Sequence, residues 1–244
     1  MRHRSFLTVL SIAVSFCVVN ASEEKDAELA SRYEAAVDHA MKDRTESEIS
    51  RNLTALVPTD HHLRWRVVDG RNQVLCVTWT HAHPSPGEKI TLSPEQSIWV
   101  TAVPELRSFC KAHRRQGVTR TLRVEQLLGL PPNFKFEYFV EFWASPEDLV
   151  RPAPDPEVSD HEAELKVRPA NRFGSVNETY LQWFNHTADI SYHGKPRYPW
   201  TRLGYTYDWG GAGNHIGLSE FVAMGGATIE IASVSSTREY LGGL

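Results

Sequence analysis

Glu220 is the residue with the clearest chemical potential, because of the strand pattern around it. The pair Gly225-Gly226 separates two alternating apolar runs, residues 218–224 and 227–235, and this predicts a two-residue hairpin turn. Pairing across that turn places Glu220 opposite Ile231 on an apolar face. A carboxylate on a buried face must be protonated, paired with a cation or open to a cleft. Glu220 is therefore a candidate catalytic residue, unless the register shifts by one residue or Glu220 lies at the solvent end of its strand.

The second chemical feature is an aromatic segment between Tyr192 and Trp209. It contains half of the tyrosines of the protein, and Arg202 and Asp208 lie among them. Aromatic faces with hydrogen-bonding edges suit sugar rings or bases, and Arg202 could pair with Glu220 or hold an anionic group. An ordinary core strand with its surface residues explains the same segment equally well.

Together these features favour an enzyme that cleaves or transfers at a glycosidic or N-glycosidic bond of a glycan or nucleotide. Such chemistry needs a carboxylate that stabilises oxocarbenium-like charge, which would be Glu220, with Arg202 orienting the substrate. Asp208 or Asp160 would be the second acid. The ring platform would consist of Trp200, Tyr205 and Tyr207. The alternative is a non-catalytic secreted or periplasmic binding or envelope protein that recognises a glycan or a protein partner through its aromatic surface. The expected ligand is a glycan or a small molecule.

The run from Ser219 through Gly226 to Val234 resembles the closing hairpin of ADP-ribosyltransferases. In that family a strand glutamate orients the nicotinamide ribose, a role that the resemblance would give to Glu220. The resemblance covers fewer than twenty residues. Leu218 stands where the family has an acidic residue, and the upstream arginine has no firm counterpart, although Arg64 or Arg66 are available.

The sequence contains no nucleophile elbow, no phosphate-binding loop, no dinucleotide glycine fingerprint and no His-Glu-x-x-His motif. His81 and His83 have a spacing that allows both to face one metal ion, but no third ligand follows from spacing. We therefore expect no cofactor and no metal. The net charge of −4 argues against nucleic acid as a partner, because that affinity depends on clustered Lys and Arg.

Residues 1–21 have the layout of a cleaved secretory signal, with Arg2 and Arg4 before an apolar stretch that ends at Ala21. The expected location is secreted or periplasmic, with no membrane anchor after cleavage. Two cysteines, Cys76 and Cys110, remain in the mature chain, and an oxidising compartment favours a disulfide between them. Two separate buried thiols are the alternative.

The elements that would position these residues indicate an α+β fold: N-terminal helices, then a largely antiparallel sheet with interspersed helices, and a closing β-hairpin. A single globular domain over residues 22–244 is expected, with a proline-rich loop or linker at 151–160. Helices are expected at 24–42, from Thr45 to Pro58, at 104–114, at 121–128 and at 177–189. Strands are expected at 63–69, 73–81, 97–103, 135–142 and in the closing hairpin.

Overall fold

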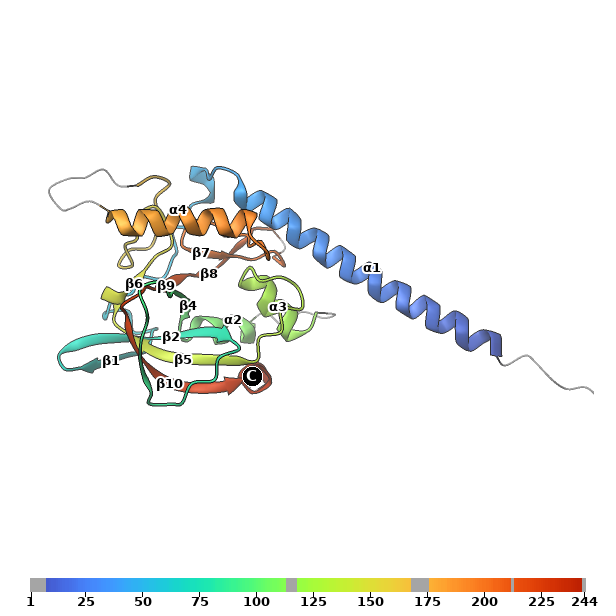
Figure 1. The fold of residues 1–244 in the computed structure, drawn as a ribbon, viewed down its shortest axis with the longest axis horizontal. Helices are drawn as coiled ribbons and strands as arrows, with labels where there is room; N and C mark the ends of the chain where they lie inside the picture. The colour runs from blue at the N-terminus through green and yellow to red at the C-terminus, as the bar shows by residue number, and fades with distance from the viewer. Residues whose placement is uncertain (1–7, 113–117, 168–175, 212, 243–244) are drawn as a thin grey trace, which may run out of the picture.

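The fold is α+β, as the sequence predicts, and is built around one large antiparallel sheet with helices between its strands (Figure 1). The computed structural model describes residues 8–112, 118–167, 176–211 and 213–242, with side chains from residue 23 onward. The helical elements are α1 Thr8–Met41, η1 Glu46–Glu48, α2 Glu105–Ala112, α3 Arg120–Leu127, η2 Pro146–Asp148, α4 Glu178–His193 and α5 Thr237–Gly242. The strands are β1 Trp65–Val68, β2 Arg71–Thr80, β3 Lys89–Thr91, β4 Ile98–Ala102, β5 Tyr138–Ala144, β6 Leu149–Val150, β7 Tyr205–Tyr207, β8 Ile216–Ser219, β9 Phe221–Ala223 and β10 Thr228–Ser236.

The large sheet has the strand order β3-β10-β5-β2-β4-β9-β6, and β1 pairs with β2 beside this path. Every pairing is antiparallel. The strands expected at 63–69 and 73–81 form the hairpin β1–β2 around Asp69-Gly70-Arg71-Asn72. Its turn consists of Asp69 and Gly70, which both have positive φ, and Val68 pairs with Arg71. A separate two-stranded hairpin, β7–β8, lies close to α4 (Figure 1).

Alternation along β2 divides the apolar residues between the two faces of the sheet. Val74 and Cys76 belong to the largest buried cluster, together with residues of β4, β5, β9 and β10. Leu75, Val77 and Trp79 point to the other face, where α2, α3 and α5 cover them. A cluster on Trp200 connects α1, α4 and β4.

The predicted disulfide between Cys76 and Cys110 is not formed, and both residues are free thiols. Cys76 points into the large cluster on one face of β2. Cys110 lies in α2, which packs on the opposite face. The sheet separates the two sulfur atoms, and a disulfide needs Cβ atoms about 4 Å apart.

The predicted turn at Gly225-Gly226 is present, but the strands on its two sides, β9 and β10, do not pair with each other. Ala227 donates to the Met224 carbonyl at 3.0 Å, and Gly226 has a φ of +92°. The two flanking strands then diverge, because β9 pairs with β4 and β6 whereas β10 pairs with β5 and β3. The backbone of Leu92 bonds to Gly226 and Ala227 instead. The predicted pairing of Glu220 with Ile231 is therefore wrong, and so is the hairpin on which the resemblance to ADP-ribosyltransferases depended.

The helix expected from Thr45 is limited to the single turn of η1. The local signal is present, because the Glu48 carboxylate accepts a hydrogen bond from the Thr45 N–H at 2.9 Å. The chain then turns extended, and Leu53 and Leu56 donate to carbonyls in the segment 158–161. These long-range bonds take the amides that a helix would have used.

The proline-rich segment 151–160 folds around one buried cation. The Arg151 side chain has no solvent exposure. Its guanidinium donates to the carbonyls of Thr54, Glu157 and Asp160 at 2.8 to 3.1 Å. This segment is therefore tied to residues 49–57 along its length.

The N-terminal part of α1 extends away from the rest of the fold (Figure 1). The expected signal segment, residues 1–21, begins outside the described residues and continues into this helix, so its cleavage remains a prediction. In the part of the chain that the structure describes, no helix combines the length and the apolar character needed to cross a membrane.

Candidate functional site

A cavity of about 950 Å³ lies against the sheet, where α4, the segment 194–201 and β7 cover β2, β4 and β5. Its walls are mostly apolar and aromatic. Representative lining residues are Trp79, Trp99, Phe134, Phe136, Tyr198 and Trp200. A volume of this size is at the upper end of the range of small-molecule sites.

Glu220 lines this cavity and lies between β8 and β9. Its backbone N–H donates to the Gly204 carbonyl at 2.9 Å, which fixes the chain at this point. Phe221 points into the core, so alternation turns Glu220 to the other face of the strand. Val100 pairs with Phe221 at the end of the β4–β9 ladder, so Glu220 lies directly beyond that ladder.

Glu220 is the one carboxylic acid among the cavity-lining residues of the described chain. Burial raises the pKa of Glu220 to about 8, because the charged form loses its hydration there. At neutral pH the side chain is therefore mostly a protonated acid, which can both donate and accept a hydrogen bond.

Three buried polar atoms in the cavity wall have no hydrogen-bond partner among the described residues. They are Glu220 Oε2, Thr101 Oγ1 and Trp200 Nε1. An unsatisfied buried polar group costs about 1–3 kcal/mol. Each of these atoms has almost no accessible surface, so a ligand reaches one of them only when neighbouring side chains move. The indole only donates, whereas the hydroxyl and the protonated carboxyl donate or accept.

Arg202 is not positioned as the partner of Glu220. Its guanidinium donates to the carbonyls of Ala40 and Lys42 at 3.2 and 2.6 Å, at the C-terminal end of α1. The same group lies over the Tyr192 ring, 5.3 Å from its centroid. The physical reason is that the last carbonyls of a helix lack partners within the helix, and a cation there satisfies them.

Asp208 is also engaged elsewhere. Both of its oxygens accept from the Arg123 guanidinium, at 2.9 and 2.5 Å, and both side chains are buried. Oδ1 accepts a further bond from the Gly210 N–H at 3.0 Å. Asp160, the other candidate for a second acid, lies 3.5 Å from the buried Arg151. Neither acid is among the residues that line the cavity.

The three aromatic candidates all contribute to the cavity wall. Trp200 is buried against Trp99 at a ring distance of 5.7 Å and presents its unpartnered N–H. Tyr205 donates its hydroxyl to the Glu48 carbonyl at 2.9 Å. The Tyr207 hydroxyl lies 3.1 Å from His39 Nδ1. The two tyrosines therefore use their polar ends outside the cavity.

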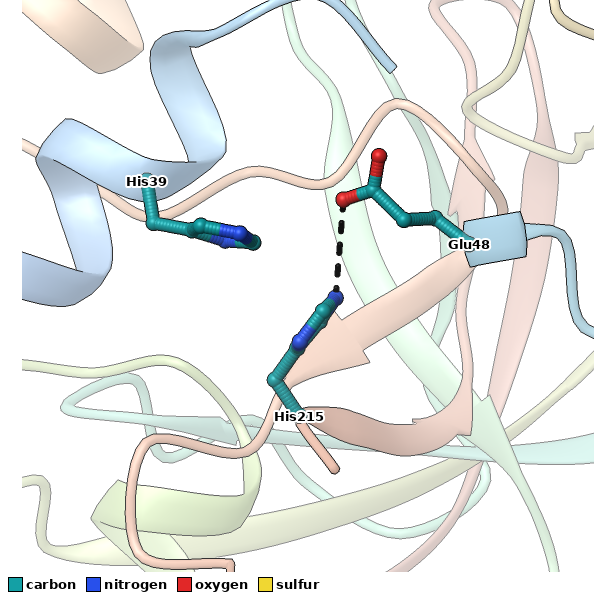
Figure 2. Close-up of side chains that lie close together, drawn as sticks. All are labelled: His39, Glu48 and His215. Atoms are coloured by element: carbon teal, nitrogen blue, oxygen red, sulfur yellow. Dashed lines mark ion pairs between the residues drawn. The ribbon is translucent and has the colours of Figure 1, made fainter. Parts of the chain in front are cut away.

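A second group of side chains lies at those tyrosine hydroxyls: His39, Glu48 and His215 (Figure 2). Sequence reasoning missed it, because the three residues come from α1, η1 and the residue before β8 and have no diagnostic spacing. His81 and His83, whose spacing allowed a shared metal ion, do not belong to this group. His81 lies 3.6 Å from Glu137 at the surface, and His83 packs on the Tyr138 ring.

Comparisons with family models, with curated proteins and with solved structures return no match to this chain. The function is therefore argued from the geometry of the cavity alone.

Proposed function

We propose that the protein is an exported, non-catalytic binding protein that holds an apolar small molecule in the cavity beside Glu220. The observation that supports this most is the large, mostly apolar cavity whose wall contains one carboxylic acid among the described residues, Glu220. Thr101 and Trp200 belong to the same wall, and Glu220 Oε2, Thr101 Oγ1 and Trp200 Nε1 have no hydrogen-bond partner among the described residues. A few polar groups in a mostly apolar pocket are typical of sites that orient a lipophilic ligand by one polar end.

The raised pKa of Glu220 favours uncharged ligands over anionic ones. A protonated carboxyl beside a hydroxyl and an indole N–H favours an uncharged oxygen function, such as a carbonyl or hydroxyl. A carboxylate ligand would face Glu220 as a second acid, and Lys195, the lysine among the lining residues, is exposed to solvent. A free glycan would bring many hydroxyls into a wall of Trp, Phe and aliphatic side chains, and most would go unsatisfied. The cavity therefore suits a largely apolar molecule with one or two oxygen atoms.

The glycosidic reaction expected from the sequence has less support. That chemistry uses two carboxyl groups flanking the scissile bond. Glu220 supplies one, but Asp208 is held by Arg123 and Asp160 by Arg151. Arg202, the expected orienting residue, binds the end of α1.

Titration with Nile red, an uncharged apolar dye with a carbonyl oxygen, tests the proposal. We expect saturable binding of one dye per chain, followed by dye fluorescence. Thr101→Val keeps the shape and removes the hydroxyl, so it should weaken binding by about 1 kcal/mol, or roughly fivefold. Trp200→Phe removes the indole N–H together with part of the ring, and should weaken binding by at least as much. Thr91→Val is the matched control, because Thr91 is exposed on β3 and bonds to Thr228.

Equal affinities for the wild type and both cavity variants would contradict the proposed polar end of the site. Absence of saturable binding would contradict the cavity as a site for apolar molecules.

A further inference from the structure

We propose that His39, Glu48 and His215 form a binding site for a divalent transition-metal ion of the zinc class. One ligand atom from each residue lies within 4.8 Å of the other two. Imidazole nitrogen and carboxylate oxygen are ligands that zinc prefers. This site is separate from the proposed ligand function of the cavity, and neither proposal depends on the other.

The distance between His215 and Glu48 fits a shared ion better than a direct contact. His215 Nε2 lies 3.9 Å from Glu48 Oε1, which is too long for a hydrogen bond. Two atoms that each bind zinc at about 2.0–2.2 Å can be at most about 4.3 Å apart, so His215 and Glu48 can share an ion as they stand. A pair at the full 4.8 Å would have to approach by about 0.5 Å to share the same ion. Nε2 is also buried and has no hydrogen-bond partner among the described residues. Figure 2 shows it pointing at the carboxylate.

Each of the three side chains is oriented by a further contact, as metal ligands usually are. The Tyr207 hydroxyl engages His39 Nδ1 at 3.1 Å, which leaves Nε2 of His39 for an ion. The Tyr207 ring stacks on His215 with centroids 4.7 Å apart and an interplanar angle of 13°. The Thr45 N–H holds Glu48 Oε2 at 2.9 Å and leaves Oε1 directed to His215.

Burial and nearby charges shift the pKa values of the three side chains. Burial, His39 and Arg44 lower the pKa of His215, and burial and Arg44 lower the pKa of His39. A lowered pKa favours the neutral imidazole, the form that binds metals. Burial acts to raise the pKa of Glu48, but the hydrogen bonds from Thr45 and the charge of Arg44 outweigh it, and the carboxylate stays ionised.

Arg44 is the competitor of a cation at this site. Its Nη1 lies 2.8 Å from Glu48 Oε1, the oxygen that faces His215. An ion that binds Oε1 must share it with the guanidinium or displace it. Replacing Arg44 by an uncharged residue should therefore tighten metal binding, whereas a plain structural cluster would gain no metal affinity from that change.

The position of the site indicates what the metal would do. His39 lies in the last turn of α1, Glu48 follows in η1, and His215 precedes β8, 167 residues further along the chain than Glu48. An ion bound by all three would fix the end of α1 to the β7–β8 hairpin. Three protein ligands would leave a fourth position for water.

The test uses Zn²⁺ alone, added to purified protein that has been treated with a chelator. Calorimetry should show one Zn²⁺ per chain, and the thermal midpoint should rise with Zn²⁺ concentration, since the folded state is the form that binds. His215→Gln and His39→Gln should each lose this binding. His62→Gln, at an exposed imidazole, is the matched control and should behave as wild type.

Two further variants separate a metal site from a structural cluster. Tyr207→Phe keeps the ring and removes the hydroxyl on His39, and should weaken Zn²⁺ binding roughly 10-fold or more. Arg44→Gln should strengthen it. Circular dichroism of each ligand variant verifies that it is folded.

The proposal is overturned if wild-type protein shows no saturable Zn²⁺ binding. It is also overturned if folded His215→Gln protein binds Zn²⁺ as tightly as the wild type does.

Discussion

The ionisation of Glu220 should make the stability of the protein depend on pH in a way that one substitution removes. Burial raises the pKa of Glu220 to about 8 in the folded state, whereas an unfolded glutamate has a pKa of about 4.3. Between these two values the folded state holds a proton that the unfolded state has lost. Stability therefore falls as pH rises through this window and is constant on either side of it.

The magnitude follows from the width of the window. Each pKa unit corresponds to 1.36 kcal/mol, so Glu220 should lower the free energy of unfolding by roughly 3 kcal/mol between pH 4 and pH 7. The loss should reach about 5 kcal/mol above pH 8. Glu220→Gln keeps the shape and the hydrogen-bonding atoms but cannot ionise. Its stability relative to the wild type should therefore grow with pH over the same window.

The assay is urea unfolding of the wild type and Glu220→Gln in steps from pH 4 to pH 9, with the difference in unfolding free energy plotted against pH. Other titrating groups cancel in this difference, including Glu105, whose pKa burial raises to about 7. Glu230→Gln, at a partly buried carboxylate that is paired with Arg66, serves as the control. A flat difference for Glu220→Gln, or one that shrinks as pH rises, would refute the buried, unpaired placement of this carboxyl.

Three other outcomes follow from the structure. Asp208→Asn should destabilise the fold by about 3–5 kcal/mol in thermal or urea unfolding, because it leaves the buried Arg123 without its charge partner; a change below 1 kcal/mol would mean that the pair is open to solvent. A thiol reagent added under denaturing, non-reducing conditions should titrate both Cys76 and Cys110, and finding neither reactive would show that they are bonded. N-terminal sequencing of the exported product should begin at Ser22, since the sequence pattern places cleavage after Ala21; a product that retains Met1 would contradict the signal.

The features that the sequence predicted correctly are local. Asp69-Gly70 favours positive φ at two successive residues, and the alternation in β2 needs only the pattern of apolar residues along one strand. The capping box at Thr45 is likewise present. The helix it would start is absent because Leu53 and Leu56 bond to a segment about 100 residues further along the chain, which no local pattern reveals.

For Glu220, too, the sequence could not predict the contacts that depend on distant parts of the chain. The sequence pattern places Glu220 on one face with Ile229 and Ile231, and Phe221 on the other. In the structure Phe221 packs in the same buried cluster as Ile229 and Ile231. The surroundings of Glu220 were predicted wrongly, because the Gly225-Gly226 turn leads β10 away to β5 rather than back along β9. Thr101 and Trp200 join Glu220 in the wall of one cavity through the pairing of β4 with β9 and the packing of Trp200 on Trp99.

Arg202 and Asp208 illustrate why polar residues in a promising segment can lack a chemical role. Both lie within a few residues of aromatic side chains that line the cavity. Each is nevertheless used by a group that needs a charge, the carbonyls at the end of α1 in one case and the buried Arg123 in the other. Tertiary structure decides which group a charged side chain binds.

A crystal structure of the Nile red complex tests the central claim most directly. The account predicts the dye in the cavity between the sheet and α4, with its carbonyl oxygen within hydrogen-bond distance of Glu220, Thr101 or Trp200. A dye bound elsewhere on the protein, or one in the cavity with all three of those polar atoms still unpartnered, would contradict it.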